Sequence, residues 1–197
     1  MSGQEPDNNN GRQFFERTTF YDRKNDLDVR MYFNLCHIFH EETDPTNQLL
    51  LMSRGIRPYD IEGKRMHVHH INQDDHTDGG QFIMLTNRLH NIKQLHNSKE
   101  EGTRTSIERV GFRRVSCGHI RTLFLDIMEG RFRHPAVTEA VLQAFLARHG
   151  NQYHKAANFA AHFQSVPRPG GIEVLTLDNT SPNTPVCRNL HVGEDGK

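Results

Sequence analysis

Apolar and polar residues follow short, strand-like patterns along the first half of the chain. Leu27–Leu35 alternates as a half-buried strand does, although Met31–His40 fits a helix equally well. Two more short strands are predicted at Arg65–Asn72 and Gln81–Thr86, with a polar, glycine-terminated loop of hairpin type between them. The first half therefore predicts a small sheet with at least one hairpin.

The apolar spacing becomes helical after the second strand of that hairpin. Thr86 or Asn87 can cap a helix there, because a short side-chain oxygen satisfies the free N–H groups of a first turn. Farther along, Ile120–Met128 and Pro135–His149 are the clearest helical segments, and the second closes at Gly150. The second half therefore predicts helices.

Both ends of the chain are polar and are predicted to be tails. Residues 1–12 contain an asparagine run and are typical of a disordered start, and residues 164–197 carry one plausible strand, Ile172–Leu177. We therefore predict one α+β domain over residues 13–163 of a small, mainly helical protein, with a helical extension over residues 104–163.

Composition narrows the function classes. Only 35% of the 197 residues are hydrophobic, and 24 basic residues balance 24 acidic ones, which excludes a wholly basic nucleic-acid coat protein. No apolar run approaches the ~20 residues of a membrane span, and the N-terminus does not resemble a signal peptide. Three widely spaced cysteines fit a reducing compartment. We therefore expect a cytoplasmic protein in the producing cell, without a membrane partner.

The chain has 14 histidines, and their placement suggests chemistry. His69 and His70 end the first strand of the predicted hairpin, and His90 and His96 lie on the helical segment after it. Adjacent strand residues point to opposite faces, so His69 and His70 cannot do the same job. One can face a metal held between strand and helix, while the other faces an opening for substrate.

This arrangement resembles the ββα-metal core of nucleases in the HNH/endonuclease VII superfamily, and within it the toxin nucleases called LHH. Val68 stands where that group usually has leucine. The resemblance runs from about Tyr59 to His96, and these features carry it: Asp60-Ile61-Glu62-Gly63, His69-His70 followed by Ile71-Asn72-Gln73, Gly79-Gly80, Leu85-Thr86, His90 and Leu95-His96.

The resemblance implies a role for each histidine in a ββα-metal motif over about Arg65–His96. His69 would be a metal ligand, His70 the general base and His90 a helix-borne ligand. His96 would be a second helix-borne ligand or a phosphate contact. A histidine with a pKa of ~6.5 suits a base at neutral pH. The ion is a divalent cation, with Mg²⁺, Mn²⁺, Ni²⁺ and Zn²⁺ all open.

The predicted activity is metal-dependent endonuclease action on DNA, with RNA left open. Arg88, Arg65 and Lys93 are the candidate phosphate contacts, with Arg88 first. Residues 104–133 hold seven arginines against three acids and form a second candidate surface for a phosphate backbone. The resemblance implies a toxin or effector delivered into a target cell by a secretion system, with an immunity protein in the producing cell.

Two other interpretations stay open at this stage. One is a housekeeping, phage or restriction-type HNH nuclease. The other is a non-catalytic module held together by a structural zinc, which would need four protein ligands and no free base. His67 shares a strand face with His69 and is left out of the ligand set. Cys117 and His119 are close in sequence, but we expect a structural role for them, because catalytic Cys/His pairs meet through the fold.

Overall fold

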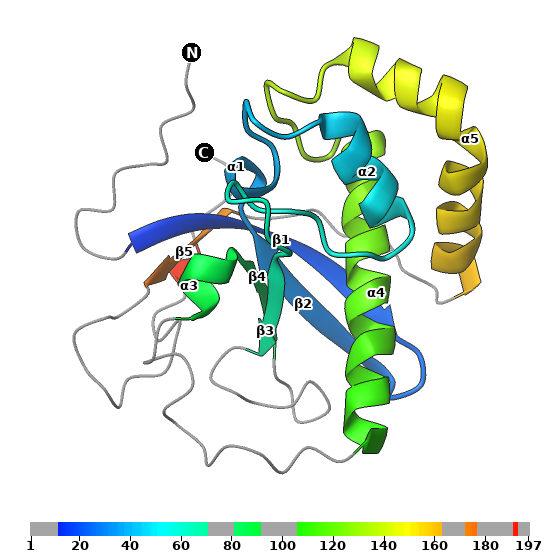
Figure 1. Cartoon of the computed structure of the whole chain (residues 1–197). Coiled ribbons are helices and arrows are strands. Elements are labelled where there is room, and N and C mark those ends of the chain that lie inside the picture. Colours follow the sequence, from blue (N-terminus) through cyan, green and yellow to red (C-terminus); the bar gives the residue numbers. More distant parts are fainter. Residues whose placement is uncertain (1–11, 71–80, 92–105, 163–171, 177–190, 193–197) are drawn as a thin grey trace.

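The computed structural model describes residues 12–70, 81–91, 106–162, 172–176 and 191–192 (Figure 1). The elements are β1 (Arg12–Asp22), β2 (Leu27–Phe33), α1 (Leu35–Ile38), α2 (Pro45–Ser53), β3 (His67–His70), β4 (Phe82–Leu85), α3 (Asn87–His90), α4 (Ser106–Met128), α5 (Glu139–His162), β5 (Ile172–Thr176) and β6 (His191–Val192). The fold is α+β, as predicted.

The strands form one sheet in the order β3-β4-β2-β1-β5-β6. Neighbouring strands are antiparallel except β2 and β4, which run parallel with Met31 opposite Phe82. A turn after Asp22 joins β1 to β2, and Asp26 adopts a left-handed φ of 51° there. The sheet therefore contains the hairpin and the strands expected near Leu27–Leu35 and Ile172–Leu177, and it adds β1 and β6, which the sequence did not predict.

The strand predicted at Ile172–Leu177 is confirmed as β5, but it belongs to the sheet rather than to a polar tail. β5 pairs with β1 over five residues, from Ile172 opposite Glu16 to Thr176 opposite Arg12, and β6 pairs with β5. The free edge of β1 offers backbone N–H and C=O groups that need partners, and β5 provides them. Helices hold more of the described residues than strands do, as expected, but the strands form one six-stranded sheet.

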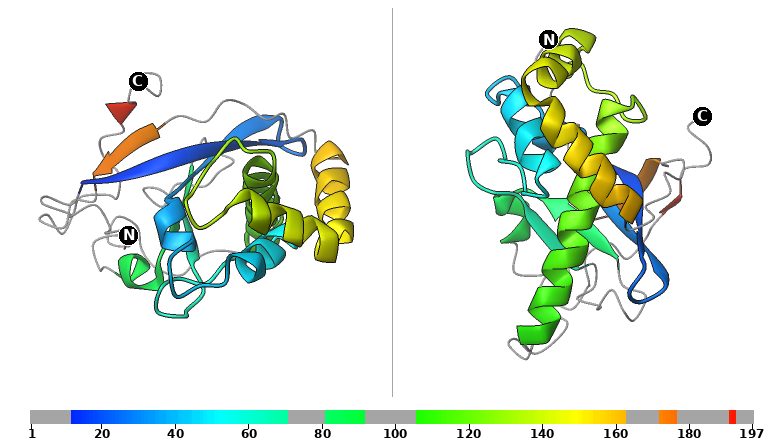
Figure 2. Two further views of the ribbon diagram at one scale, coloured as in Figure 1. Left: turned by 90° about the horizontal axis from the view of Figure 1, so that it is seen from above. Right: turned by 90° about the vertical axis from the view of Figure 1, so that its right-hand side faces the viewer.

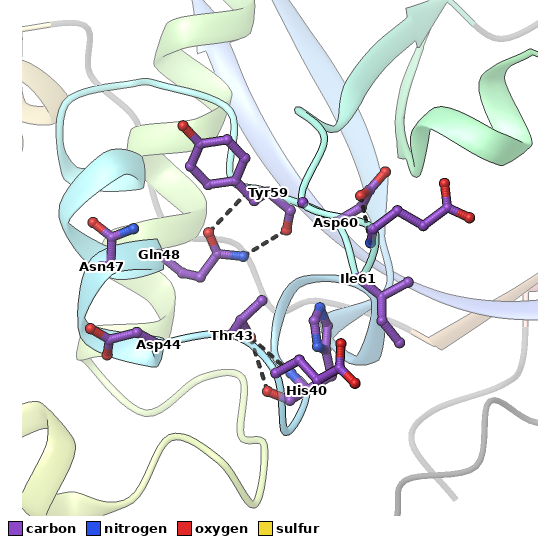
Figure 3. Close-up of a pocket in the computed structure, with 11 residues that line it drawn as sticks. His40, Thr43, Asp44, Asn47, Gln48, Tyr59, Asp60 and Ile61 are labelled. Atoms are coloured by element: carbon purple, nitrogen blue, oxygen red, sulfur yellow. Dashed lines mark hydrogen bonds between the residues drawn. The ribbon is translucent and has the colours of Figure 1, made fainter.

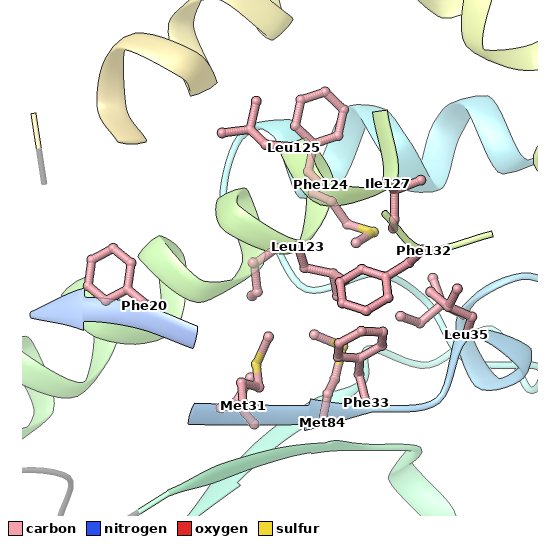
Figure 4. Packing of buried hydrophobic residues seen from close by; sticks show 14 of the residues in the cluster. Phe20, Met31, Phe33, Leu35, Met84, Leu123, Phe124, Leu125, Ile127 and Phe132 are labelled. Atoms are coloured by element: carbon pink, nitrogen blue, oxygen red, sulfur yellow. The ribbon is translucent and has the colours of Figure 1, made fainter. Parts of the chain in front are cut away.

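One face of the sheet carries the hydrophobic core. Val29, Met31 and Phe33 alternate along β2 and are fully buried, with Phe33 against Phe132 in an edge-to-face contact (Figure 4). α4 runs across this face, and α2 and α5 pack against α4 (Figure 2). The buried side chains that alternate along β2 and those on the buried side of α4 therefore pack into one core.

A glycine lets α4 lie close to the sheet. A Cβ built on Gly118 would come within 2.7 Å of the Phe20 ring on β1, well inside van der Waals contact. Only glycine allows the helix backbone to approach this strand so closely. The Cys117-Gly118-His119 segment therefore belongs to the packing of α4, in line with the structural role expected for it.

The two long helices contain the predicted helical segments but differ from them at the ends. α5 begins at Glu139 rather than near Pro135, because Thr138 accepts the Val141 N–H through its side chain. The helix also passes Gly150, with a kink at His149 (φ −130°, ψ 28°) where a stop was predicted. Within the part of the chain that the structure describes, no helix is long and apolar enough to cross a membrane.

Candidate functional site

The β3–β4 hairpin has two different faces. His67 lies opposite Leu85 and His69 opposite Ile83, and such cross-strand pairs share a face. Between them, Val68 faces the other way and belongs to the hydrophobic core. The period of two along β3 therefore separates His69 from His70, as the sequence predicted.

Three histidines gather on the face away from the core, where α3 lies beside the hairpin (Figure 1). The ring centroids of His69 and His90 are 5.5 Å apart, and the rings are inclined by 73°. His67 and His90 stack face to face, with centroids 4.2 Å apart and planes within 2° of parallel. The fold therefore brings together His69 and His90, two of the predicted ligands, and adds His67.

The pair His69 and His90 fits a shared metal ion. Imidazoles at ~2.0–2.1 Å from one tetrahedral ion have ring centroids roughly 5 Å apart, close to the separation seen here. Among the described residues there is no group of three or more His, Cys, Asp or Glu side chains placed to hold a metal. His96, the third predicted ligand, lies outside the described residues. The donor chemistry among the described residues at this face is thus that of two imidazoles.

A buried carboxylate fastens α3 to the start of the hairpin. Asp60 is 1% exposed, and its Oδ1 accepts the backbone N–H groups of Glu62 and Lys64 at 2.9 and 3.0 Å. Its Oδ2 accepts the N–H of Asn87, the first residue of α3, at 2.9 Å. Asn87 in turn accepts a hydrogen bond from His67 Nε2 on its Oδ1, also at 2.9 Å. These bonds set the position of α3, and with it His90, relative to β3.

His70 is the last residue of β3, on the face toward the core. Its ring contacts Phe82, its partner across the hairpin, with centroids 4.7 Å apart, and Phe82 contacts His119 on α4. His70 is 3% exposed. The sequence predicts an opening for substrate beside His70, whereas in the structure its ring lies against the Phe82 ring. The residues that follow it, 71–80, lie outside those described.

The candidate phosphate contacts have different surroundings. Arg88 lies exposed on α3, two residues before His90. Arg65 donates to the Arg57 carbonyl at 2.8 Å, and its guanidinium lies 4.1 Å from the centroid of the Tyr59 ring. Lys93 lies outside the described residues. Arg88 is therefore the one of the three that the structure places exposed beside the histidines.

Three arginines of the second half, Arg114, Arg121 and Arg131, contact other groups of the protein. Arg114 pairs with Asp22 at 2.7 Å, and Arg131 bonds Asp126 at 2.9 Å and also pairs with Glu129. The Arg121 guanidinium lies over the Phe159 ring. α4 lies on the opposite side of the hairpin from α3 (Figure 1). This surface is therefore separated from the histidines, and its charge is partly neutralised.

A polar pocket of about 470 Å³ opens next to Asp60 (Figure 3). Gln48 spans its wall, accepting the Tyr59 N–H at 3.0 Å and donating to the Tyr59 carbonyl at 2.7 Å. Four carboxylates line it, those of Glu42, Asp44, Asp60 and Glu62, and no Lys or Arg is among the described residues that do. Such a lining repels a phosphate backbone, so this pocket is a poor site for one.

Two residues of this cluster, His67 and Asn87, were not among the site residues predicted from the sequence. His67 shares the parity of His69, which already indicated the same strand face. The sequence predicts for Asn87 only an alternative role as helix cap. In the structure Thr86 caps α3, because its side chain accepts the Leu89 N–H at 3.2 Å. No local signal reveals the contact between Asn87 and His67, because it joins residues 20 positions apart.

A known protein family matches the segment that contains these histidines. Residues 46–118 match the family model LHH, described as a nuclease of the HNH/ENDO VII superfamily with conserved LHH. This segment is thus similar to the LHH family. It runs from α2 to the middle of α4, beyond both ends of the stretch on which the resemblance was first based. No curated protein and no solved structure shows a significant match to the chain.

This family match confirms the predicted resemblance. It indicates an HNH/ENDO VII-type nuclease, which implies a nucleic acid as substrate. The match covers less than half of the 197 residues. It contains the β3–β4 hairpin and α3, which follow one another in the predicted order, and the Val68-His69-His70 triplet at the end of β3.

Proposed function

We propose that the protein is a metal-dependent endonuclease that hydrolyses phosphodiester bonds of DNA. The observation that carries this proposal is the convergence of His69 and His90 from β3 and α3, inside the segment that matches the nuclease family. In this proposal β3, β4 and α3 are the ββα-metal motif. The non-catalytic zinc module has weaker support, because only two of the described histidines are placed to share an ion.

His69 and His90 hold the divalent cation in this proposal, and His96 completes the ligand set or contacts phosphate. The bound cation supplies charge neutralisation at the scissile phosphate and at the leaving oxygen. Arg88, Arg65 and Lys93 bind the phosphate backbone, with Arg88 nearest in sequence to the histidines. Mg²⁺, Mn²⁺, Ni²⁺ and Zn²⁺ are all compatible with imidazole and water ligands in an incomplete protein shell.

His70 is the proposed general base. An imidazole has the proton affinity needed to take a proton from water near neutral pH. The contact with Phe82 holds the ring on the face away from the ligands, so the base is not consumed as a ligand.

The biological role that we propose is a toxin or effector nuclease, restrained in the producing cell by an immunity protein. The family resemblance supports this role. A housekeeping, phage or restriction-type nuclease would share the same chemistry. Growth of cells that express the wild-type protein, compared with cells that express His69→Ala, separates the two, because only a toxin arrests growth.

Plasmid nicking by the purified full chain tests the chemistry. We expect wild type to cut with at least one of Mg²⁺, Mn²⁺, Ni²⁺ and Zn²⁺ and to stop in EDTA. His69→Ala and His90→Ala should lose cutting with every metal. His154→Ala, an exposed histidine on α5, is the matched control and should cut as wild type does.

Two results would contradict the proposal. If wild type cuts equally well in EDTA, the metal plays no part in the reaction. If His69→Ala and His90→Ala cut as wild type does while both remain folded, the histidines of β3 and α3 are not the site.

A further inference from the structure

His67 lies outside the Val68-His69-His70 triplet, yet its ring covers the ring of His90. We infer that His67 is a positioning residue that holds the His90 imidazole in the orientation needed to bind the cation, an inference that rests on the proposed function. Two contacts carry it: the parallel stack on His90, at 4.2 Å between centroids, and the hydrogen bond to Asn87.

The stacking geometry excludes His67 as a ligand to the ion that His90 binds. A metal bonds an imidazole nitrogen through its lone pair, which lies in the plane of the ring. The planes of His67 and His90 are parallel within 2° and stacked, so no ion can lie in both. The rings of His69 and His90 are inclined by 73°, and their planes do cross. His69 and His90 can therefore share an ion, and His67 supports one of them.

His67 is held in place by a chain of hydrogen bonds that ends at a buried carboxylate. Because the Asn87 Oδ1 only accepts, the His67 Nε2 carries the proton in this bond. Asn87 donates its backbone N–H to Asp60, which is 1% exposed and accepts two more N–H groups. Asp60, Asn87 and His67 thus link the turn before β3 to the face of His90. Groups that orient a metal ligand in this way raise the affinity for the metal.

Cobalt binding tests this role without any use of nuclease activity. Co²⁺ is titrated into the full-length protein, and its visible absorption reports both the affinity and the ligand geometry. We expect His67→Ala to weaken Co²⁺ binding about 10–100-fold while the spectrum at saturation stays that of wild type. His67→Phe keeps an aromatic plane over His90 but has no nitrogen to bond Asn87, and it should restore part of the lost affinity.

The controls separate positioning from loss of the fold. Thermal unfolding in EDTA shows whether each variant is folded, and His154→Ala, exposed on α5, should bind Co²⁺ as wild type does. His90→Ala should change the spectrum itself, because it removes a ligand. Asn87→Ala should weaken binding in the same direction as His67→Ala, since it removes the partner that holds the His67 ring.

Three outcomes would overturn the inference. Unchanged Co²⁺ affinity in His67→Ala would show that the stack does not matter. A His67→Phe variant as weak as His67→Ala, with an altered spectrum, would make His67 a ligand. If His69→Ala and His90→Ala both bind Co²⁺ as wild type does, the metal site of the proposed function is wrong, and the positioning role falls with it.

Discussion

The two faces of the β3–β4 hairpin use the same residue type in opposite ways. On the outer face, His67 and His69 meet His90 and form a polar cluster held by hydrogen bonds to α3. On the inner face, His70 lies against Phe82 beside the hydrophobic core. A histidine in this protein is therefore defined by the side of the strand it occupies, and a shift of one residue would exchange the two roles.

The energetic demands on the two faces also differ. The inner face depends on the close packing of the core that it joins, where even one added carbon meets a neighbour, as at Gly118 of α4 against Phe20 of β1. The outer face depends on the direction of a few side chains around an ion. Substitutions can therefore separate the two, because a packing change lowers stability whereas a change in ligand direction lowers metal affinity.

The largest expected effect separates packing from chemistry at His70. His70→Phe keeps a ring against Phe82, so we expect stability within about 1.5 kcal/mol of wild type. Nicking should fall about 10²–10⁴-fold, because the proposed base is lost. Co²⁺ affinity should stay at the wild-type value. Wild-type nicking by a folded His70→Phe protein would leave His70 as a packing residue only.

The second prediction concerns the packing of the core at Gly118, where α4 lies against β1. Gly118→Val drives carbon atoms into the Phe20 ring, and we expect a loss of about 1–3 kcal/mol in the free energy of unfolding, measured in urea. Co²⁺ affinity of the folded variant should not change. Gly150→Val is the matched control, because nothing lies within 4 Å of a Cβ there. Equal losses in the two variants would show that the close approach of α4 to β1 is unimportant.

The third prediction tests the hydrogen bonds through which Asp60 links the turn before β3 to α3. Asp60→Ala leaves three N–H groups without their acceptor, so we expect a loss of about 1–3 kcal/mol together with weaker Co²⁺ binding. Asp44→Ala is the control, since this exposed carboxylate only caps α2 through the Thr46 N–H. It should cost about 1 kcal/mol and leave Co²⁺ binding unchanged. An Asp60→Ala variant that binds Co²⁺ normally would contradict the link.

The smallest expected effect is a pH dependence on β1. Burial raises the pKa of Glu16 above its ordinary value of 4.5, and its Oε2 has no hydrogen-bond partner among the described residues. The unfolded chain releases this proton first, so the contribution of Glu16 to stability falls as pH rises from 4.5 through the raised pKa. Glu16→Gln removes this fall and should be slightly more stable than wild type at pH 7.

Urea unfolding of wild type and Glu16→Gln at several pH values measures this difference. The gain of the variant should grow across that pH window and then level off. The same substitution at Glu41, which is exposed, should give a difference that does not change with pH. A constant difference at Glu16 would show that its burial does not matter.

Local patterns were sufficient for the elements around the site. The hairpin strands were predicted at Arg65–Asn72 and Gln81–Thr86 and lie at His67–His70 and Phe82–Leu85. The helix after them begins where predicted, with Thr86 as its cap. These features follow from alternation and capping, which depend on neighbours in sequence. The family resemblance depended on the same short stretch and is confirmed by the match.

The sequence by itself determined the hairpin, the separation of His69 from His70, and the family, because each depends on residues close together along the chain. Only the tertiary structure decided that β5 completes the sheet, that His67 stacks on His90, and that Asp60 and Asn87 hold the two in place. Those contacts join residues from 20 positions apart (His67 and Asn87) to 164 positions apart (Arg12 and Thr176). No local period encodes such a contact, since it forms only when distant segments are packed together.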